Sequence, residues 1–309
     1  VFVAGASGLV GSAVVRELER QGVTKIDAPS SAELNLLDRD RVFSHLRNNT
    51  PDLVIDAAAR VGGIHANNSY PADFLSQNLM IQLNLMDAAA EAGIERFVFL
   101  GSSCIYPKFA PQPIHESSLL TGELEPTNSA YAVAKIAGIQ QVQAQRKQNH
   151  RHWISAMPTN IYGPGDNFHP EDSHVVPALL RRIHEAAERR DTQVVIWGTG
   201  SPLREFLYSD DLAKAIVFLA DCYDSDDIIN LGSGEEVSIL ELAEIISEVV
   251  GFNGKLVFDS TKPDGTPRKL LDTSRLQDLG WIPETSLRKG LAMTYEWFLA
   301  HKDHYRGRL

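Results

Sequence analysis

The stretch Gly5-Ala6-Ser7-Gly8-Leu9-Val10-Gly11 decides how this chain folds. It follows an apolar run at residues 1–4 and opens a helical pattern at residues 9–21, so its glycines lie where a strand turns into a helix. Glycine permits positive φ and a close approach of the backbone, and a helix N-terminus offers unpaired N–H groups to a pyrophosphate. We therefore predict a dinucleotide-binding turn whose contacts come from Gly5, Ser7, Gly8, Leu9, Val10 and Gly11.

Apolar runs alternate with helical patterns from this turn to about residue 149. The runs at 53–55 and 97–100 are apolar without alternation, as is typical of strands buried on both faces of a parallel sheet. Beyond the Pro- and Gly-bearing stretch 158–170, helices mix with short isolated strands at 193–197, 228–231 and 255–258. We predict an α/β fold: a doubly wound parallel sheet of the Rossmann type at residues 1–165, and a smaller C-terminal α/β domain at 166–309 that binds the substrate and returns some segments to the first domain.

The charge and cysteine content of the chain argue against several classes of partner and location. A formal net charge of -11 would repel a nucleic acid or an anionic membrane surface, so neither is expected. Two cysteines, Cys104 and Cys222, fit a reducing compartment, and no signal peptide or apolar run of membrane length is present, so we expect a cytoplasmic protein. His169, Asp172 and His174 have no supporting ligand set, and we expect no metal. Because the chain opens inside an apolar strand without Met, we expect that residues before it are missing.

The type of nicotinamide cofactor stays open at this point. Small side chains at Ala57-Ala58-Ala59 would let a cofactor lie close to the backbone, so Ala58 is a predicted contact. Asp27, sixteen residues past Gly11, could hold ribose hydroxyls, whereas residues 25–31 contain no Arg to pair with a 2′-phosphate. Lys25 is the one cation in this segment, and these residues do not distinguish NAD from NADP as the cofactor.

Tyr131 and Lys135 are the candidate catalytic pair. Four residues apart in a helical stretch, they share one face, and an ammonium together with a nicotinamide ring would favour the phenolate. A Tyr and a Lys at this spacing are usually ordinary helix surface, but here they follow a dinucleotide turn. Ser102, at the carboxyl end of the run 97–100, is the natural partner for a substrate oxygen.

Together, the Gly-x-x-Gly-x-x-Gly turn, Ser102 and Tyr-x-x-x-Lys resemble the extended short-chain dehydrogenase/reductases. More narrowly, several motifs resemble the GDP-L-fucose synthases over nearly the whole chain. These motifs are Val61-Gly62-Gly63-Ile64, Tyr70-Pro71-Ala72-Asp73-Phe74, Gly101 to Pro107, Pro158-Thr159-Asn160, Asp166-Asn167-Phe168-His169-Pro170, Ser173-His174-Val175 and Lys262 to Leu271.

This resemblance implies that one pocket converts GDP-4-keto-6-deoxy-D-mannose to GDP-L-fucose by epimerising C3 and C5 and reducing the C4 ketone with NADPH. It implies that Cys104 is the base and His174 the acid of the epimerisations. It further implies that Tyr131, held by Lys135 and Ser102, protonates the oxygen during reduction, and that Lys135 also contacts the cofactor. The implied contacts to the GDP-sugar are Asn160, Arg182, Trp197, Arg204 and Lys269.

The resemblance also implies a homodimer formed through helices near 71–92 and 129–149. Ser7 and Ser31 depart from it, because NADPH-using members often carry Arg at these places. Three other functions are weighed: a sugar-nucleotide 4-epimerase that recycles NAD, a 4,6-dehydratase, and a non-catalytic Rossmann protein that binds a nucleotide. Cys104 and His174 count against the simple epimerase, and the neutral Ser103-Cys104 pair counts against the dehydratase.

Overall fold

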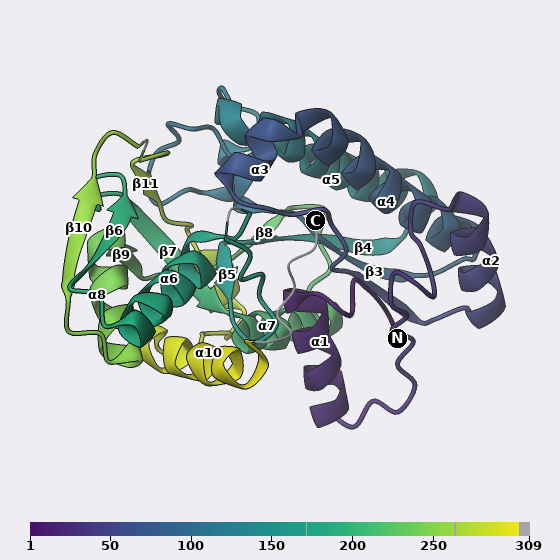
Figure 1. The fold of residues 1–309 in the computed structure, drawn as a ribbon. Coiled ribbons are helices and arrows are strands. Elements are labelled where there is room, and N and C mark those ends of the chain that lie inside the picture. Colours follow the sequence, from purple (N-terminus) through teal and green to yellow (C-terminus); the bar gives the residue numbers. More distant parts are fainter. Residues whose placement is uncertain (171, 263, 303–309) are drawn as a thin grey trace.

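The computed structural model describes residues 1–170, 172–262 and 264–302 (Figure 1). Within these ranges, parallel strands form a central five-stranded sheet in the order β1-β2-β3-β4-β8. The strands are β1 (Phe2–Ala4), β2 (Leu53–Asp56), β3 (Arg96–Leu100), β4 (His152–Pro158) and β8 (Ile229–Leu231). The predicted doubly wound parallel sheet is therefore confirmed.

The apolar run at 23–27 does not form a full strand. It lies along the free side of β1, where the N–H of Val3 donates to the carbonyl of Asp27 at 2.9 Å, but only one bridge, Phe2 to Asp27, is formed. The chain thus passes from β1 to this side and then crosses to β2 on the other side. Such a reversal of strand order is where doubly wound sheets bind their ligands.

Helices cover both faces of the sheet, as the continuous apolar strands predict. On β3, Phe97 and Phe99 pack in the core under α4 and α5, whereas Val98 points to the opposite face, under α1 and α7. Figure 1 shows these two pairs of helices on opposite sides of β3 and β4. The helices of this half are α1 (Leu9–Arg20), α2 (Arg39–Asn49), α3 (Ile64–Ser69), α4 (Pro71–Glu91), α5 (Ser129–Asn149), α7 (Ser209–Cys222) and α9 (Ser274–Asp278).

A separate core belongs to the other half of the molecule. Its helices α6 (Val175–Arg189), α8 (Ile239–Val250) and α10 (Leu287–His301) enclose buried residues such as Phe168, Leu180 and Ile246. The predicted capping box at the start of α8 is present: the Ser238 hydroxyl accepts from the N–H of Glu241 at 3.1 Å. The strands of this half are β5 (Asn160–Tyr162), β6 (Gln193–Trp197), β7 (Leu203–Tyr208), β9 (Glu236–Ser238), β10 (Lys255–Asp259) and β11 (Arg268–Lys269).

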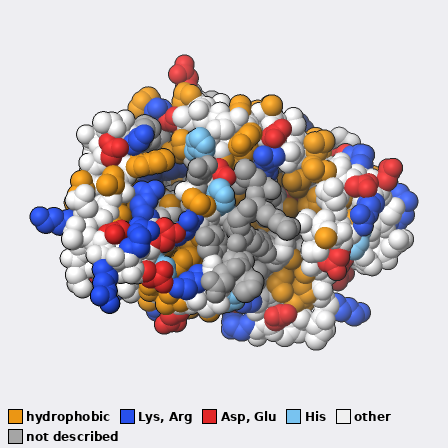
Figure 2. Space-filling view, viewed as in Figure 1, with side chains coloured by type: hydrophobic (Ala, Val, Ile, Leu, Met, Phe, Trp, Pro, Cys, Tyr) orange, Lys and Arg blue, Asp and Glu red, His pale blue; other side chains and the backbone are white. Residues whose placement is uncertain are grey.

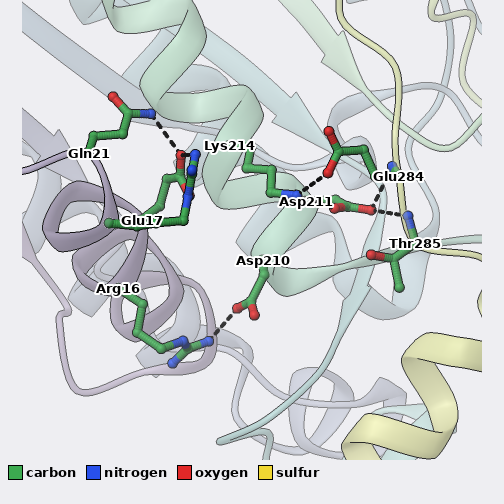
Figure 3. A network of polar contacts seen from close by, with 9 residues as sticks. Arg16, Glu17, Gln21, Asp210, Asp211, Lys214, Glu284 and Thr285 are labelled. Atoms are coloured by element: carbon green, nitrogen blue, oxygen red, sulfur yellow. Dashed lines mark hydrogen bonds and ion pairs between the residues drawn. The ribbon is translucent and has the colours of Figure 1, made fainter.

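Polar contacts fasten α7 to both halves (Figure 3). Arg16 of α1 pairs with Asp210, and the buried carboxylate of Asp211 accepts from the backbone N–H groups of Glu284 at 3.0 Å and Thr285 at 2.7 Å. One end of α7 therefore holds the helix of the glycine turn and the segment before α10 in fixed places. Among the described residues, no helix combines the length and apolar character needed to span a bilayer.

Short 3₁₀ turns sit at the mouth between the halves. They are η1 (Ser103–Ile105), η2 (Glu116–Ser118) and η3 (Pro126–Asn128), and they follow β3 or precede α5. Because β3 and α5 carry the candidate catalytic residues at their ends, these turns shape the surroundings of the site.

Candidate active site

The glycine turn has the shape that a dinucleotide needs. Gly5 has a φ of +73°, and a Cβ there would lie 2.8 Å from the carbonyl oxygen of Ala57. A Cβ on Gly11 would lie 2.1 Å from the carbonyl oxygen of Gly5. Gly8 caps α1 without any side-chain hydrogen bond, so the N–H groups of the first turn are not covered by a side chain. The cradle fits a pyrophosphate held by backbone N–H groups.

The other predicted cofactor contacts lie around this cradle. Ser7 is exposed in the turn, and Leu9 and Val10 begin α1. The N–H of Ala58 donates to the Asp56 carboxylate at 3.1 Å, which fixes the segment after β2 beside the turn. Asp27, the candidate ribose contact, is instead engaged by His45 of α2 at 2.7 Å. Its carboxylate is therefore directed to α2.

Tyr131, Lys135 and Ser102 come together as predicted. The ammonium of Lys135 donates to the carbonyl of Leu100 at 2.8 Å and lies 6.0 Å from the centre of the Tyr131 ring. The side chain of Ser102 lies close enough to the Tyr131 hydroxyl to favour its charged form. Gly138 allows this approach of α5 to β3, because a Cβ there would lie 2.3 Å from the ring of Phe99.

Burial adds an effect on Tyr131 that opposes the one expected from the ammonium and the nicotinamide ring. Burial, followed by the nearby charge of Cys104, raises the pKa of Tyr131, while the nearby side chain of Ser102 opposes this shift. Burial also lowers the pKa of Lys135, although the Asp56 carboxylate opposes the effect. Desolvation thus outweighs the attraction that predicted a phenolate. A phenol that keeps its proton is a donor, which is the form that reduction of a ketone requires.

Asp56 is a site residue that sequence reasoning missed. It ends β2, is fully buried, and its Oδ2 has no hydrogen-bond partner among the described residues. Burial raises the pKa of Asp56 to about 6, opposed by the positive charge of Lys135. The available signal was an acidic residue directly after the apolar run 53–55 of a buried strand.

Cys104 lies in η1 and lines a recess together with Asn128 and Lys269. Its sulfur accepts from the Asn128 amide at 3.4 Å and from the Lys269 ammonium at 3.6 Å. Asn128 stands at the N-cap of α5 but makes no capping hydrogen bond with its side chain, although Asn is a favoured cap. Asn128 is a second residue that the sequence did not single out; its place three residues before Tyr131 was the only signal.

His174 occupies the N-cap of α6. His174 is exposed, yet desolvation by the surrounding protein atoms lowers the pKa of its imidazole. The charge of Lys269 lowers that pKa further. Lys269 therefore acts electrostatically on His174 as well as contacting Cys104. Tyr131 is also within electrostatic reach of Cys104, so the residues proposed for epimerisation and reduction share one site.

The predicted GDP-sugar residues form two groups. The Arg182 guanidinium lies 5.6 Å from the centre of the Trp197 ring, which is 59% exposed, and donates to the carbonyl of Val195 at 3.0 Å. Arg204 and Lys269 are paired in register on β7 and β11. On the face seen in Figure 2, Lys and Arg side chains gather over β7 and α6, the strand of Arg204 and the helix of Arg182.

Asn160 is placed differently from the other predicted substrate contacts. It starts β5, and its side-chain amide donates to the backbone carbonyl of Glu205 at 2.8 Å. His169 pairs with Asp172 at 3.3 Å, and no group of three or more His, Cys, Asp or Glu side chains among the described residues is arranged to hold a metal ion.

Comparisons with known proteins agree with this geometry. A model of the NAD dependent epimerase/dehydratase family matches residues 1–232. GDP-L-fucose synthase 1 of Arabidopsis thaliana is 61% identical over 97% of this chain and 93% of its own length. GDP-L-fucose synthase of Escherichia coli (strain K12) is 52% identical over 99% of this chain and 98% of its own length. The solved structure of a GDP-L-fucose synthetase from Naegleria fowleri bound to NADP is 28% identical, with a TM-score of 0.90 over 99% of this chain and 95% of that one.

Proposed function

The chain belongs to the NAD dependent epimerase/dehydratase family, and from that premise we propose that it acts as a GDP-L-fucose synthase. It converts GDP-4-keto-6-deoxy-D-mannose to GDP-L-fucose by epimerising C3 and C5 and reducing the C4 ketone with NADPH. One observation carries the proposal: Lys135 lies 6.0 Å from the Tyr131 ring and donates to the carbonyl of Leu100 at the end of β3, the strand that leads into Ser102 and Cys104, and Lys269 contacts the sulfur of Cys104 at 3.6 Å. The groups for both reactions thus share one site.

The epimerisations need an acid and a base beside a stabilised oxygen. Protons next to a ketone are acidic because the carbanion delocalises onto the carbonyl oxygen as an enolate. Cys104 removes such a proton and His174 supplies one. The hydroxyls of Tyr131 and Ser102 stabilise the negative oxygen by hydrogen bonding, in the manner of an oxyanion hole.

The reduction needs a proton at the oxygen of C4. NADPH, when bound, supplies the hydride. Tyr131 donates the proton, because burial keeps its hydroxyl protonated, and Lys135 and Ser102 hold that hydroxyl at the carboxyl end of β3. The glycine turn of residues 5–11 and the N-terminus of α1 hold the pyrophosphate of the cofactor.

The nucleotide end of the substrate meets the other half of the molecule. Trp197 offers an exposed ring on which a base can stack, with the Arg182 guanidinium 5.6 Å away. Arg204, half-buried on β7, is a candidate for bidentate pairing with the diphosphate. Asn160 and Lys269 complete the proposed contacts.

The assembly and the location are proposed on separate grounds. Met80, Leu83 and Val133 are exposed apolar side chains on α4 and α5, which supports a homodimer formed through these two helices. Both cysteines are free, which supports a cytoplasmic location. We propose a cofactor domain at residues 1–165 and a mainly substrate-binding domain at 166–309, with α7 and β8 packing with the first domain.

The experiment that tests the function follows the absorbance of the reduced nicotinamide with GDP-4-keto-6-deoxy-D-mannose, supplying NADPH and NADH in parallel. Substrate-dependent oxidation with formation of GDP-L-fucose is the expected result. Loss of the substrate without oxidation of either cofactor would overturn the reductase and leave an epimerase. Binding of cofactor with no turnover would instead indicate a non-catalytic nucleotide-binding protein.

A further inference from the structure

Lys269 lies on a two-residue strand that directs neighbouring side chains to opposite sides. β11 runs parallel to β7, and its first residue, Arg268, turns to Glu236, with contacts of 2.8 and 3.0 Å from its Nε. Successive side chains of a strand point to opposite faces. Lys269 is engaged differently from Arg268, because its ammonium lies 3.6 Å from the sulfur of Cys104.

The cations that line the recess of Cys104 differ in their partners. Lys108 pairs with Glu125 at 2.9 Å, and Arg268 pairs with Glu236 at 2.7 Å. No carboxylate of the described residues lies within 4.0 Å of the Lys269 ammonium, so its charge is not balanced by an ion pair there. Its charge therefore acts on the sulfur and on the imidazole of His174.

The sulfur of Cys104 is surrounded by hydrogen-bond donors. Asn128 donates from one side chain and Lys269 from another, at 3.4 and 3.6 Å. Two N–H donors directed at one sulfur fix its orientation, and a neighbouring ammonium stabilises negative charge that develops on it. Asn128 serves this arrangement and not the cap of its own helix, since its side chain makes no capping hydrogen bond.

We propose that Lys269 is a positioning residue for the epimerisation, whose ammonium, 3.6 Å from the sulfur, orients Cys104 as the base and stabilises negative charge on that sulfur. The assignment of this role to epimerisation rests on the proposed function. In the step, the C–H bond next to the ketone breaks, an S–H bond forms on Cys104, and the electron pair moves to the carbonyl oxygen. A new C–H bond then forms on the opposite face with a proton from His174, and water restores both groups, so no oxidant or reductant is consumed.

The charges around the pair are consistent with this role. The pKa of His174, an exposed residue, is lowered first by desolvation from the surrounding protein atoms and then by the charge of Lys269. The other titratable groups that line the recess are Tyr106, whose hydroxyl donates to Asn230 and whose pKa is raised by burial, and two ion pairs, Lys108 with Glu125 and Arg268 with Glu236, in which opposite charges largely cancel. Lys269 is thus the cation whose removal changes both the base and the acid.

The test is the alkylation rate of each cysteine by iodoacetamide between about pH 6 and 9, resolved by peptide mass spectrometry on the full chain without substrate. Cys222 is exposed on α7 and serves as the internal reference thiol. Lys269→Met should slow alkylation of Cys104 at neutral pH about tenfold and leave Cys222 unchanged, whereas Lys269→Arg should restore most of the rate. Lys108→Met, which removes a paired cation from the same recess, should leave the rate of Cys104 unchanged.

Two readouts separate this role from simple binding of the diphosphate. Lys269→Met should slow solvent deuterium incorporation about tenfold at saturating substrate, in addition to any rise in KM from the lost substrate contact. An unchanged Cys104 rate together with a raised KM would overturn the proposal, because Lys269 would then only bind the nucleotide-sugar. If the Met variant does not fold, Lys269→Gln removes the charge while keeping a donor and gives the same comparison. Alkylation needs no substrate, so it remains decisive even if the proposed function fails.

Discussion

Replacing Tyr131 by Phe removes one hydroxyl from the site and little else. The ring of residue 131 still packs edge-on against Phe74, whose centre is 6.4 Å away. Ser102 loses its contact with the phenol but still accepts from the N–H of Cys104 at 3.2 Å. The structural cost is therefore at most that of one buried hydrogen bond, about 1 kcal/mol, which should leave the fold intact.

The chemical cost falls on one of the two reactions. A positioned general acid contributes about 10²–10⁴ to a rate, equivalent to about 3–5 kcal/mol of activation free energy, and Tyr131 is the proton donor proposed for the C4 oxygen. Epimerisation keeps its base, Cys104, and retains Ser102 as one of the two donors to the enolate oxygen. Tyr131→Phe should therefore lose reduction by this full factor and lose exchange at C3 and C5 by much less.

Both rates can be measured on the same sample, by absorbance of the reduced nicotinamide and by deuterium incorporation from D₂O. Tyr162→Phe is the matched control, because its hydroxyl donates to the carbonyl of Leu287 at 3.3 Å in the core of the other half. It should lose similar stability and retain both rates. If Tyr131→Phe oxidised NADPH at more than about a tenth of the normal rate, Tyr131 would not be the proton donor.

Three further predictions concern the base, the scaffold and the buried carboxyl. Cys104→Ser should stop deuterium incorporation while preserving NADPH binding in a fluorescence titration; normal incorporation would remove Cys104 from the role of base. Asp211→Ala should lower the free energy of unfolding in urea by about 3 kcal/mol, because two backbone N–H groups lose their buried acceptor. Asp210→Ala, which breaks only an exposed ion pair, should cost less than about 1 kcal/mol, and equal losses would contradict the distinction. Burial raises the pKa of Asp56 to about 6, so the stability that its neutral carboxyl provides is present below about pH 4 and is lost as the pH rises through 6. Asp56→Asn should therefore stabilise the chain at pH 7 by up to about 3 kcal/mol and have little effect at pH 4, and urea midpoints that shift equally at both pH values would refute this.

Local pattern was sufficient for the parts of the fold that short-range physics determines. The turn at Gly5, Gly8 and Gly11 could be predicted because only glycine fits where a Cβ would meet backbone atoms. Tyr131 and Lys135 could be paired because helical spacing places them on one face. The unbroken apolar run at 97–100 predicted a strand buried on both faces, and the structure places helices on both sides of it.

Contacts between distant segments could not be read in the same way. Lys269 reaches Cys104 across 165 residues of sequence, and nothing near either residue specifies that meeting. The run at 23–27 has the composition of a strand, but only one bridge to β1 forms. The burial of Tyr131, which raises its pKa, is likewise a property that the sequence does not show, whereas the neighbouring ammonium can be read from helical spacing.

The long-range contact of Lys269 and the burial of Tyr131 matter most to the chemistry. One site must hold two weak acids, one protonated and one deprotonated. Reduction requires Tyr131 to keep its proton, whereas epimerisation requires Cys104 to lose one. Burial serves the first need, since it penalises the phenolate, and a negative sulfur nearby reinforces the effect. The second need is met by directed donors, Asn128 and Lys269, which reach the sulfur from outside α5 and β3. Negative charge that develops on this sulfur when it acts as a base would help to keep the phenol neutral, so the group that prepares the substrate for reduction would also maintain the proton donor that completes it.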